Sequence, residues 1–165
     1  IPGVDMSSGS LGQGISAAVG MAIAGKMDNA DYRVYTLLGD GEIQEGQVWE
    51  ASMMAGFRKL DNLVVIVDNN GLQIDGPVDQ VCSPYPINEK FKAFNFHVVD
   101  LADGNDIDQI AAAFAEARNT KGQPTAIIAH TVKGKGVSFM ENQVGWHGRP
   151  LKPEEFETAM KELEA

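Results

Sequence analysis

Short apolar runs alternate along the chain with longer segments whose apolar residues recur at helical spacing. The apolar runs predict strands at residues 34–38, 63–67, 96–99 and 125–129. The helical spacing predicts helices at residues 14–27, 45–57, 107–117 and 153–163. Strands that alternate with helices build an open parallel sheet with helices on both faces. We therefore expect an α/β fold, a three-layer α/β/α sandwich around a mainly parallel sheet.

The ends of the first two predicted strands carry polar turns. Gly39-Asp40-Gly41 follows the first strand, and Asp68-Asn69-Asn70 follows the second. A right-handed crossover places two such loops side by side at the carboxyl edge of the sheet, where these folds bind ligands. Asp40 and Asn70 are thirty positions apart in the chain, and we expect them to meet at one point.

These turns supply oxygen ligands of the kind that Mg²⁺ prefers. Asp40 offers a carboxylate, Asn70 an amide oxygen, and the Gly71-Leu72 turn a backbone carbonyl. Three protein oxygens leave room on the ion for a diphosphate, and the glycines at 39 and 41 let the backbone approach an anion. Each signal alone has a structural alternative, because Gly-Asp-Gly is a common turn and Asn residues often cap strands or helices.

Composition narrows the classes of function. The chain has 13 Lys and Arg against 23 Asp and Glu, a formal net charge of −10, which disfavours binding to nucleic acid. A phosphorylated ligand would therefore need backbone amides or a cation. We find no apolar run of membrane-spanning length in the sequence, and we expect no secretory leader. Its single cysteine, Cys82, reads as a free thiol in a reducing compartment, so we expect a cytoplasmic protein that binds no membrane.

Several stretches resemble transketolase, and in particular the amino-terminal subunit of transketolases that are split into two polypeptides. The resemblance is carried by residues 39–51, 59–63 and 68–76, by Pro2-Gly3-Val4 and 9–14 upstream, and by 134–136 and 146–148 downstream. It extends over nearly the whole chain. It implies the thiamine diphosphate-binding fold, with residues 1–165 forming a single diphosphate-binding domain. Ile1 is not an initiator Met, and we expect the family's amino-terminal portion to precede it.

The resemblance also implies a cofactor site for thiamine diphosphate and Mg²⁺, with Ca²⁺ or Mn²⁺ as substitutes. Asp40 and Asn70 correspond to side-chain ligands of the metal, and Leu72 to a backbone ligand. Gly39 corresponds to an amide donor to the diphosphate, with Gly41 completing the turn. Three further positions correspond to residues that line the cofactor's rings, namely Gly9, Leu11 and Ile74. Without the resemblance, Leu11 and Ile74 would be read as core residues.

Three more residues correspond to family positions with catalytic roles. Glu45 and Glu50, which we place on the helix after the first strand, match carboxylates at the interface between subunits. His147, in Trp146-His147-Gly148, matches a histidine that reaches the substrate and assists proton transfer, a role that suits an imidazole. His97 and His130 lie in or beside predicted strands, where a hydrogen-bonded structural histidine is expected.

The activity that the resemblance implies is transfer of a two-carbon ketol unit from a ketose phosphate to an aldose phosphate. The family's activating glutamate lies in a pyrimidine-binding domain that this sequence lacks, so we expect a pyrimidine-domain partner subunit and an α2β2 assembly. We also expect exposed apolar surface on the helix carrying Glu45, Trp49 and Met53. Alternatives are deoxyxylulose-phosphate synthase, a transketolase for sulfonated or branched sugars, and a non-catalytic cofactor-binding or assembly module.

Overall fold

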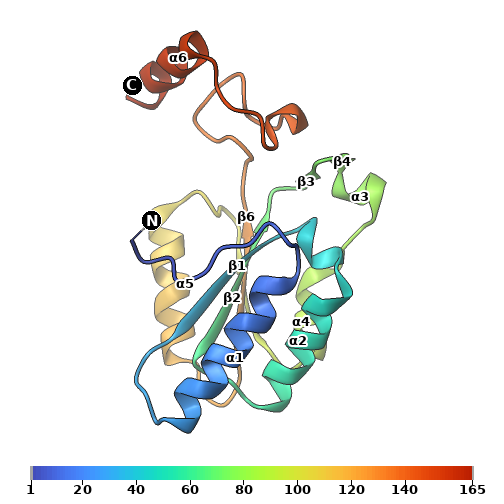
Figure 1. Cartoon of the computed structure of the whole chain (residues 1–165), viewed down its shortest axis with the longest axis vertical. Coiled ribbons are helices and arrows are strands. Elements are labelled where there is room, and N and C mark those ends of the chain that lie inside the picture. Colours follow the sequence, from blue (N-terminus) through green and yellow to red (C-terminus); the bar gives the residue numbers. More distant parts are fainter. Residues whose placement is uncertain (1, 165) are drawn as a thin grey trace.

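The computed structural model describes residues 2–164, and the expectation concerning Ile1 lies outside the described residues. Its centre is a four-stranded parallel sheet with the strand order β1-β2-β6-β5 (Figure 1). The strands are β1 (Val34–Gly39), β2 (Leu63–Asn69), β5 (His97–Leu101) and β6 (Thr125–His130). The predicted strands and their parallel arrangement are confirmed, each with its end shifted by one or two residues.

Helices cover both faces of the sheet, which confirms the three-layer prediction. One face packs against α1 (Gln13–Met27), α2 (Gly46–Phe57) and α4 (Ile87–Ala93), around buried residues such as Ile15, Val48 and Phe91. The other face packs against α5 (Ile107–Asn119) through a smaller apolar cluster. This second layer leaves Leu37 of the edge strand β1 exposed over 69% of its surface.

Short elements that the sequence did not reveal follow the second strand. A two-stranded antiparallel hairpin joins β3 (Leu72–Gln73) to β4 (Gly76–Pro77), and a single turn of helix, α3 (Val78–Val81), comes next. The first strand is also followed by a 3₁₀ turn, η1 (Glu42–Gln44). Glu45 is therefore the residue before α2, and its expected place on that helix is wrong because the extended backbone at Glu45 ends the 3₁₀ turn.

The last part of the chain folds on itself and stands apart from the sheet (Figure 1). It contains η2 (Val144–Trp146) and α6 (Pro153–Leu163). Ser138 anchors α6 to the preceding loop, because its backbone N–H and its hydroxyl both donate to Glu162. Among the apolar residues of α6, Ala159 is buried, whereas Phe156, Met160 and Leu163 are exposed. Among the described residues no helix combines the length and apolar character needed to cross a membrane.

Close packing between α2 and the end of α4 gives a direct test of the fold. A Cβ atom at Gly56 would lie 1.9 Å from the carbonyl oxygen of Phe94. We expect Gly56→Ala to lower the free energy of unfolding by about 1–3 kcal/mol, because backbone must move to relieve the clash.

Gly20→Ala in α1 is the matched control. Its Cβ meets nothing within 4 Å, so it should raise stability by about 0.5–1 kcal/mol. Urea unfolding followed by circular dichroism measures both, and equal stabilities would contradict the packing.

Candidate functional site

Asp40 lies at the carboxyl end of β1, where the backbone of two neighbouring strands brings the polar turns together. Its N–H donates to the carbonyl of Asp68 on β2, at 3.1 Å. Its carboxylate accepts hydrogen bonds from the N–H of Gly41 at 2.8 Å and from the N–H of Gly71 at 2.5 Å. Asp40 is 1% exposed. The structure thus joins the Gly-Asp-Gly turn directly to the loop that contains Asn70.

Burial raises the pKa of the Asp40 carboxyl, and the N–H groups of Gly71 and Gly41 oppose that rise without cancelling it. The negative charge of Asp68 also raises this pKa. A carboxylate in such a position is stabilised by any cation bound beside it. The electrostatics of the turn therefore favour a positively charged ligand.

The Asn70 side chain is held at both ends. Its Oδ1 accepts a hydrogen bond from the N–H of Leu72 at 3.0 Å, and its Nδ2 donates to Oδ2 of Asp68 at 3.1 Å. An amide oxygen has two lone pairs, so the oxygen of Asn70 retains one for a further partner.

The backbone carbonyl of Leu72 has no N–H opposite it in the hairpin. Leu72 pairs with Pro77, and proline has no N–H to donate. The carbonyl is therefore left available at the same turn as Asn70.

Together these groups form a set of hard oxygen donors. Within residues 2–164 no three His, Cys, Asp or Glu side chains gather as a metal site. One carboxylate, one amide oxygen and one backbone carbonyl could hold an ion that takes its remaining oxygens from a ligand. That arrangement fits Mg²⁺ with a bound diphosphate.

Glu42, which the sequence did not single out, ties the glycine-rich turn before α1 to the end of β1. One carboxylate oxygen accepts from the N–H of Gly12 at 3.0 Å, and the other accepts from the N–H of Gly39 at 3.1 Å. In this structure the N–H of Gly39 is bound to Glu42, so donation from Gly39 to a diphosphate, which stays a prediction, would require Glu42 to release it. Glu42 follows the Gly-Asp-Gly turn directly in the sequence. An acidic residue in that position is the sequence signal that could have identified Glu42 as part of the site.

The residues expected to line the cofactor's rings lie on the surface near these turns. Leu11 is 53% exposed and Ile74 is 63% exposed, so the alternative that they belong to the core is wrong. Gly9 is also exposed, in the turn before α1. Exposed apolar side chains beside a polar turn are suited to cover an aromatic ligand.

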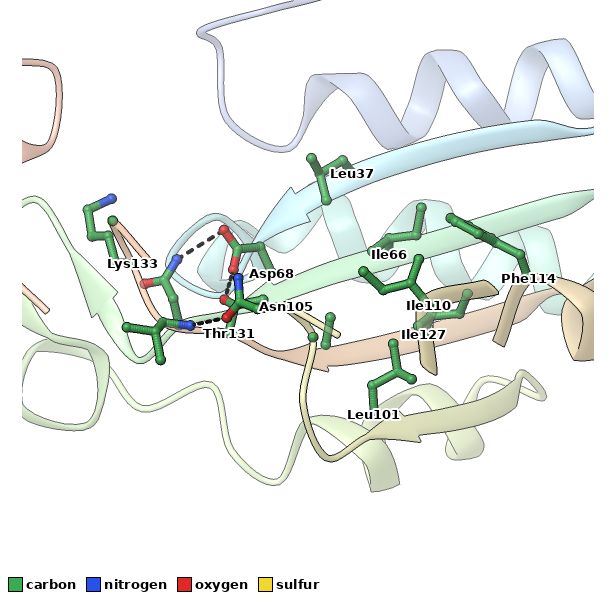
Figure 2. Close-up of a pocket in the computed structure, with 15 residues that line it drawn as sticks. Leu37, Ile66, Asp68, Leu101, Asn105, Ile110, Phe114, Ile127, Thr131 and Lys133 are labelled. Atoms are coloured by element: carbon green, nitrogen blue, oxygen red, sulfur yellow. Dashed lines mark hydrogen bonds between the residues drawn. The ribbon is translucent and has the colours of Figure 1, made fainter. Parts of the chain in front are cut away.

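A cavity of about 420 Å³ opens beside the ends of β2 and β6. Figure 2 shows its polar end, where Asp68, Thr131 and Lys133 lie, and its apolar part, which includes Leu37 and Ile66. Thr131 and Lys133 were not predicted to belong to the site. The signal that could have found them is their position just after a predicted strand, at the sheet edge that binds ligands.

The predicted catalytic residues are not gathered at this cavity. Glu45 and Glu50 are exposed on and before α2, and His147 is exposed at the end of η2. The loop around His147 is ordered by its neighbour Trp146, whose Nε1 donates to the Phe139 carbonyl at 2.9 Å. The guanidinium of Arg149 stacks over the Trp146 ring at 3.9 Å.

The other two histidines form the structural hydrogen bonds expected of them. His97 contacts Glu116 at 2.6 Å. His130 contacts Asp100 at 2.8 Å and Asn69 at 3.1 Å.

The outer face of α2 exposes apolar side chains, as expected, but with one exception. Met53 is 60% exposed and Phe57 is 77% exposed. Trp49 instead packs against Phe91 and Phe94 of the α4 region, with ring centroids 5.3 and 5.9 Å away. The exposed apolar surface therefore lies toward the end of α2.

Comparison with known proteins identifies the family. Residues 1–164 match the family described as "Transketolase, thiamine diphosphate binding domain". The chain belongs to the transketolase family. The fold agrees, since the transketolase of Campylobacter jejuni superposes on 98% of the chain with a TM-score of 0.91 and 35% identity.

Two similar transketolases are named as subunits. The 6-deoxy-6-sulfo-D-fructose transketolase subunit SqwG of Clostridium sp. (strain MSTE9) is 46% identical over 98% of the chain. An apulose-4-phosphate transketolase subunit of Phocaeicola vulgatus is 42% identical over 99% of it. The chain spans 58% of the length of each of these relatives and 26% of the Campylobacter transketolase.

Proposed function

We propose that the chain is the thiamine diphosphate- and Mg²⁺-binding part of a split transketolase. With a pyrimidine-domain subunit it would transfer a two-carbon ketol unit from a ketose phosphate to an aldose phosphate. The observation that carries this proposal is the hydrogen bond from the N–H of Gly71 to the Asp40 carboxylate, which joins the turn after β1 to the loop that contains Asn70 and Leu72. Membership of the transketolase family supports the same cofactor.

Each part of the site has a separate role in this proposal. Asp40, Asn70 and Leu72 hold the metal ion, which offsets the negative charge of both the diphosphate and the chain. The turn at Gly39 and Gly41 and the ammonium of Lys133 would lie beside the diphosphate, since Lys133 lines the same cavity as Asp68 and Asn70. Gly9, Leu11 and Ile74 cover the cofactor's rings.

The chemistry that thiamine diphosphate supplies when bound is a carbon nucleophile that can stabilise negative charge. His147 would hold or transfer a proton at the substrate oxygen from its exposed imidazole. Glu45 and Glu50 would lie at the contact between subunits, where the exposed apolar end of α2 also supports an interface. An α2β2 assembly would bring His147 toward the cofactor.

The identity of the sugar has a second candidate. Two subunit-type relatives bear the names of a sulfonated ketose and of apulose 4-phosphate. These names favour an unusual sugar over the common pentose phosphates. The Glu42-Ile43-Gln44-Glu45-Gly46 stretch disfavours deoxyxylulose-phosphate synthase.

Mixing the subunits tests the proposal. We expect no ketol transfer from this chain alone and transfer once the pyrimidine-domain subunit is added, because the activating glutamate comes from that subunit. The assay would use a panel of phosphorylated and sulfonated ketoses with thiamine diphosphate and MgCl₂, and the matched control omits MgCl₂. Turnover by the chain alone would contradict the split-enzyme proposal, and inactivity with a verified partner would favour the non-catalytic module.

A further inference from the structure

Asp68 lies between the two proposed side-chain ligands of the metal, at the end of β2. Its Oδ2 accepts a hydrogen bond from Nδ2 of Asn70 at 3.1 Å. Its Oδ1 accepts a hydrogen bond from the hydroxyl of Thr131, which follows β6 (Figure 2). Its backbone carbonyl accepts from the N–H of Asp40. Asp68 thus contacts the Asn70 side chain, the Asp40 backbone and the neighbouring strand.

The bond between Asp68 and Asn70 fixes the donor end of that amide, and the N–H of Leu72 holds the acceptor end. An amide has a donor end and an acceptor end of nearly the same shape. Because the carboxylate of Asp68 can only accept, it binds the NH₂ group and turns the oxygen of Asn70 the other way. Without this partner only the N–H of Leu72, which donates to Oδ1 at 3.0 Å, opposes rotation of the amide. A rotated amide would turn its NH₂ group toward the cation and repel it.

We propose that Asp68 is a positioning residue that orients the amide of Asn70, so that Oδ1 faces the magnesium ion of the bound cofactor. Thr131 holds Asp68 in place from β6. This inference rests on the proposed function, because it requires the metal site of a thiamine diphosphate enzyme. Partners in the outer shell of a metal site commonly change metal affinity by about 10–100-fold when they are removed.

Three variants test the role of Asp68 in the assembled enzyme. We expect Asp68→Ala to weaken the apparent affinity for Mg²⁺ by about 10–100-fold, measured by calorimetry at saturating thiamine diphosphate. Asp68→Asn should restore most of that affinity, because the oxygen of an asparagine can still accept from Nδ2 of Asn70. Thr131→Val should weaken Mg²⁺ binding by about 2–10-fold, the effect of one lost hydrogen bond. The Thr131 variant also keeps the test open if Asp68→Ala does not fold.

The thermal unfolding of each metal-free variant separates positioning from folding. If Asp68 only stabilised the fold, the Mg²⁺ affinity of each variant would fall in proportion to the thermal stability of its metal-free form. Asp68→Asn would then not restore the affinity. That result would overturn the inference, as would Asp68→Ala with wild-type Mg²⁺ affinity. If the wild-type enzyme bound thiamine diphosphate without Mg²⁺, both the proposed function and the positioning role of Asp68 would be wrong. Mg²⁺-dependent binding in the wild type with an unchanged Asp68→Ala would overturn the positioning role alone.

Discussion

Asp40→Ala is expected to abolish the Mg²⁺-dependent binding of thiamine diphosphate, with a loss of affinity on the order of 100-fold or more, equivalent to about 2.7 kcal/mol. Asp40 is the only carboxylate in the proposed ligand set, and it is 1% exposed. Its removal takes away the charged ligand and the acceptor for the N–H groups of Gly41 and Gly71. Calorimetry of the assembled enzyme, with and without MgCl₂, measures the effect.

Asp79→Ala is the matched control for that experiment. Asp79 is an exposed carboxylate in α3, a short distance along the chain from the same loop. Its removal changes the net charge by the same amount, so a general electrostatic effect would appear in both variants. Wild-type affinity in Asp40→Ala, or equal losses in the two variants, would rule out the proposed ligand set.

The sheet could be predicted from the sequence because its two central strands, β2 and β6, are buried on both faces along most of their length. Buried parallel strands read as continuous apolar runs, as in residues 63–67 and 125–129. The order and parallel sense of the first two strands then place Asp40 beside the Asn70 loop without further information. The position of the candidate metal site is thus a consequence of local patterns and one crossover rule.

The rest of the site depends on contacts between segments that are distant in the chain. Thr131 contacts Asp68 across 63 positions, and Glu42 contacts Gly12 across 30. No local spacing encodes such pairs. The bond from the N–H of Gly39 to Glu42 is local, but it depends on a 3₁₀ turn that the sequence did not reveal. Trp49 is covered by the aromatic residues of α4, a short helix that periodicity did not reveal.

The self-packed segment after β6 explains why His147 stays outside the cavity. Phe139, Trp146 and Arg149 stack in succession within this segment, and Glu162 fixes α6 to its beginning. The segment thus has its own contacts and holds the histidine on its surface. In the proposed assembly the partner subunit would close over this surface, which makes His147 a residue of the shared site.

His147→Ala is expected to lower kcat for ketol transfer by about 10²–10⁴-fold, the usual contribution of a general acid or base. The affinity for thiamine diphosphate and Mg²⁺ should stay within about two-fold of the wild type, because Asp40, Asn70 and Leu72 are untouched. His147→Gln should be equally slow, since an amide can donate a hydrogen bond but cannot exchange a proton in this role. Steady-state kinetics of the mixed subunits, with cofactor binding measured separately, provide the comparison.

His97→Ala supplies the control for loss of a histidine. His97 bonds to Glu116 at the surface between β5 and α5, and a surface change of this kind alters stability by no more than about 0.5 kcal/mol. Its kcat should equal that of the wild type. If His147→Ala lost cofactor affinity in proportion to kcat, the histidine would act in binding the diphosphate. If it lost neither, the proton-transfer role would be excluded, and the ordered loop around Trp146 would serve the subunit contact alone.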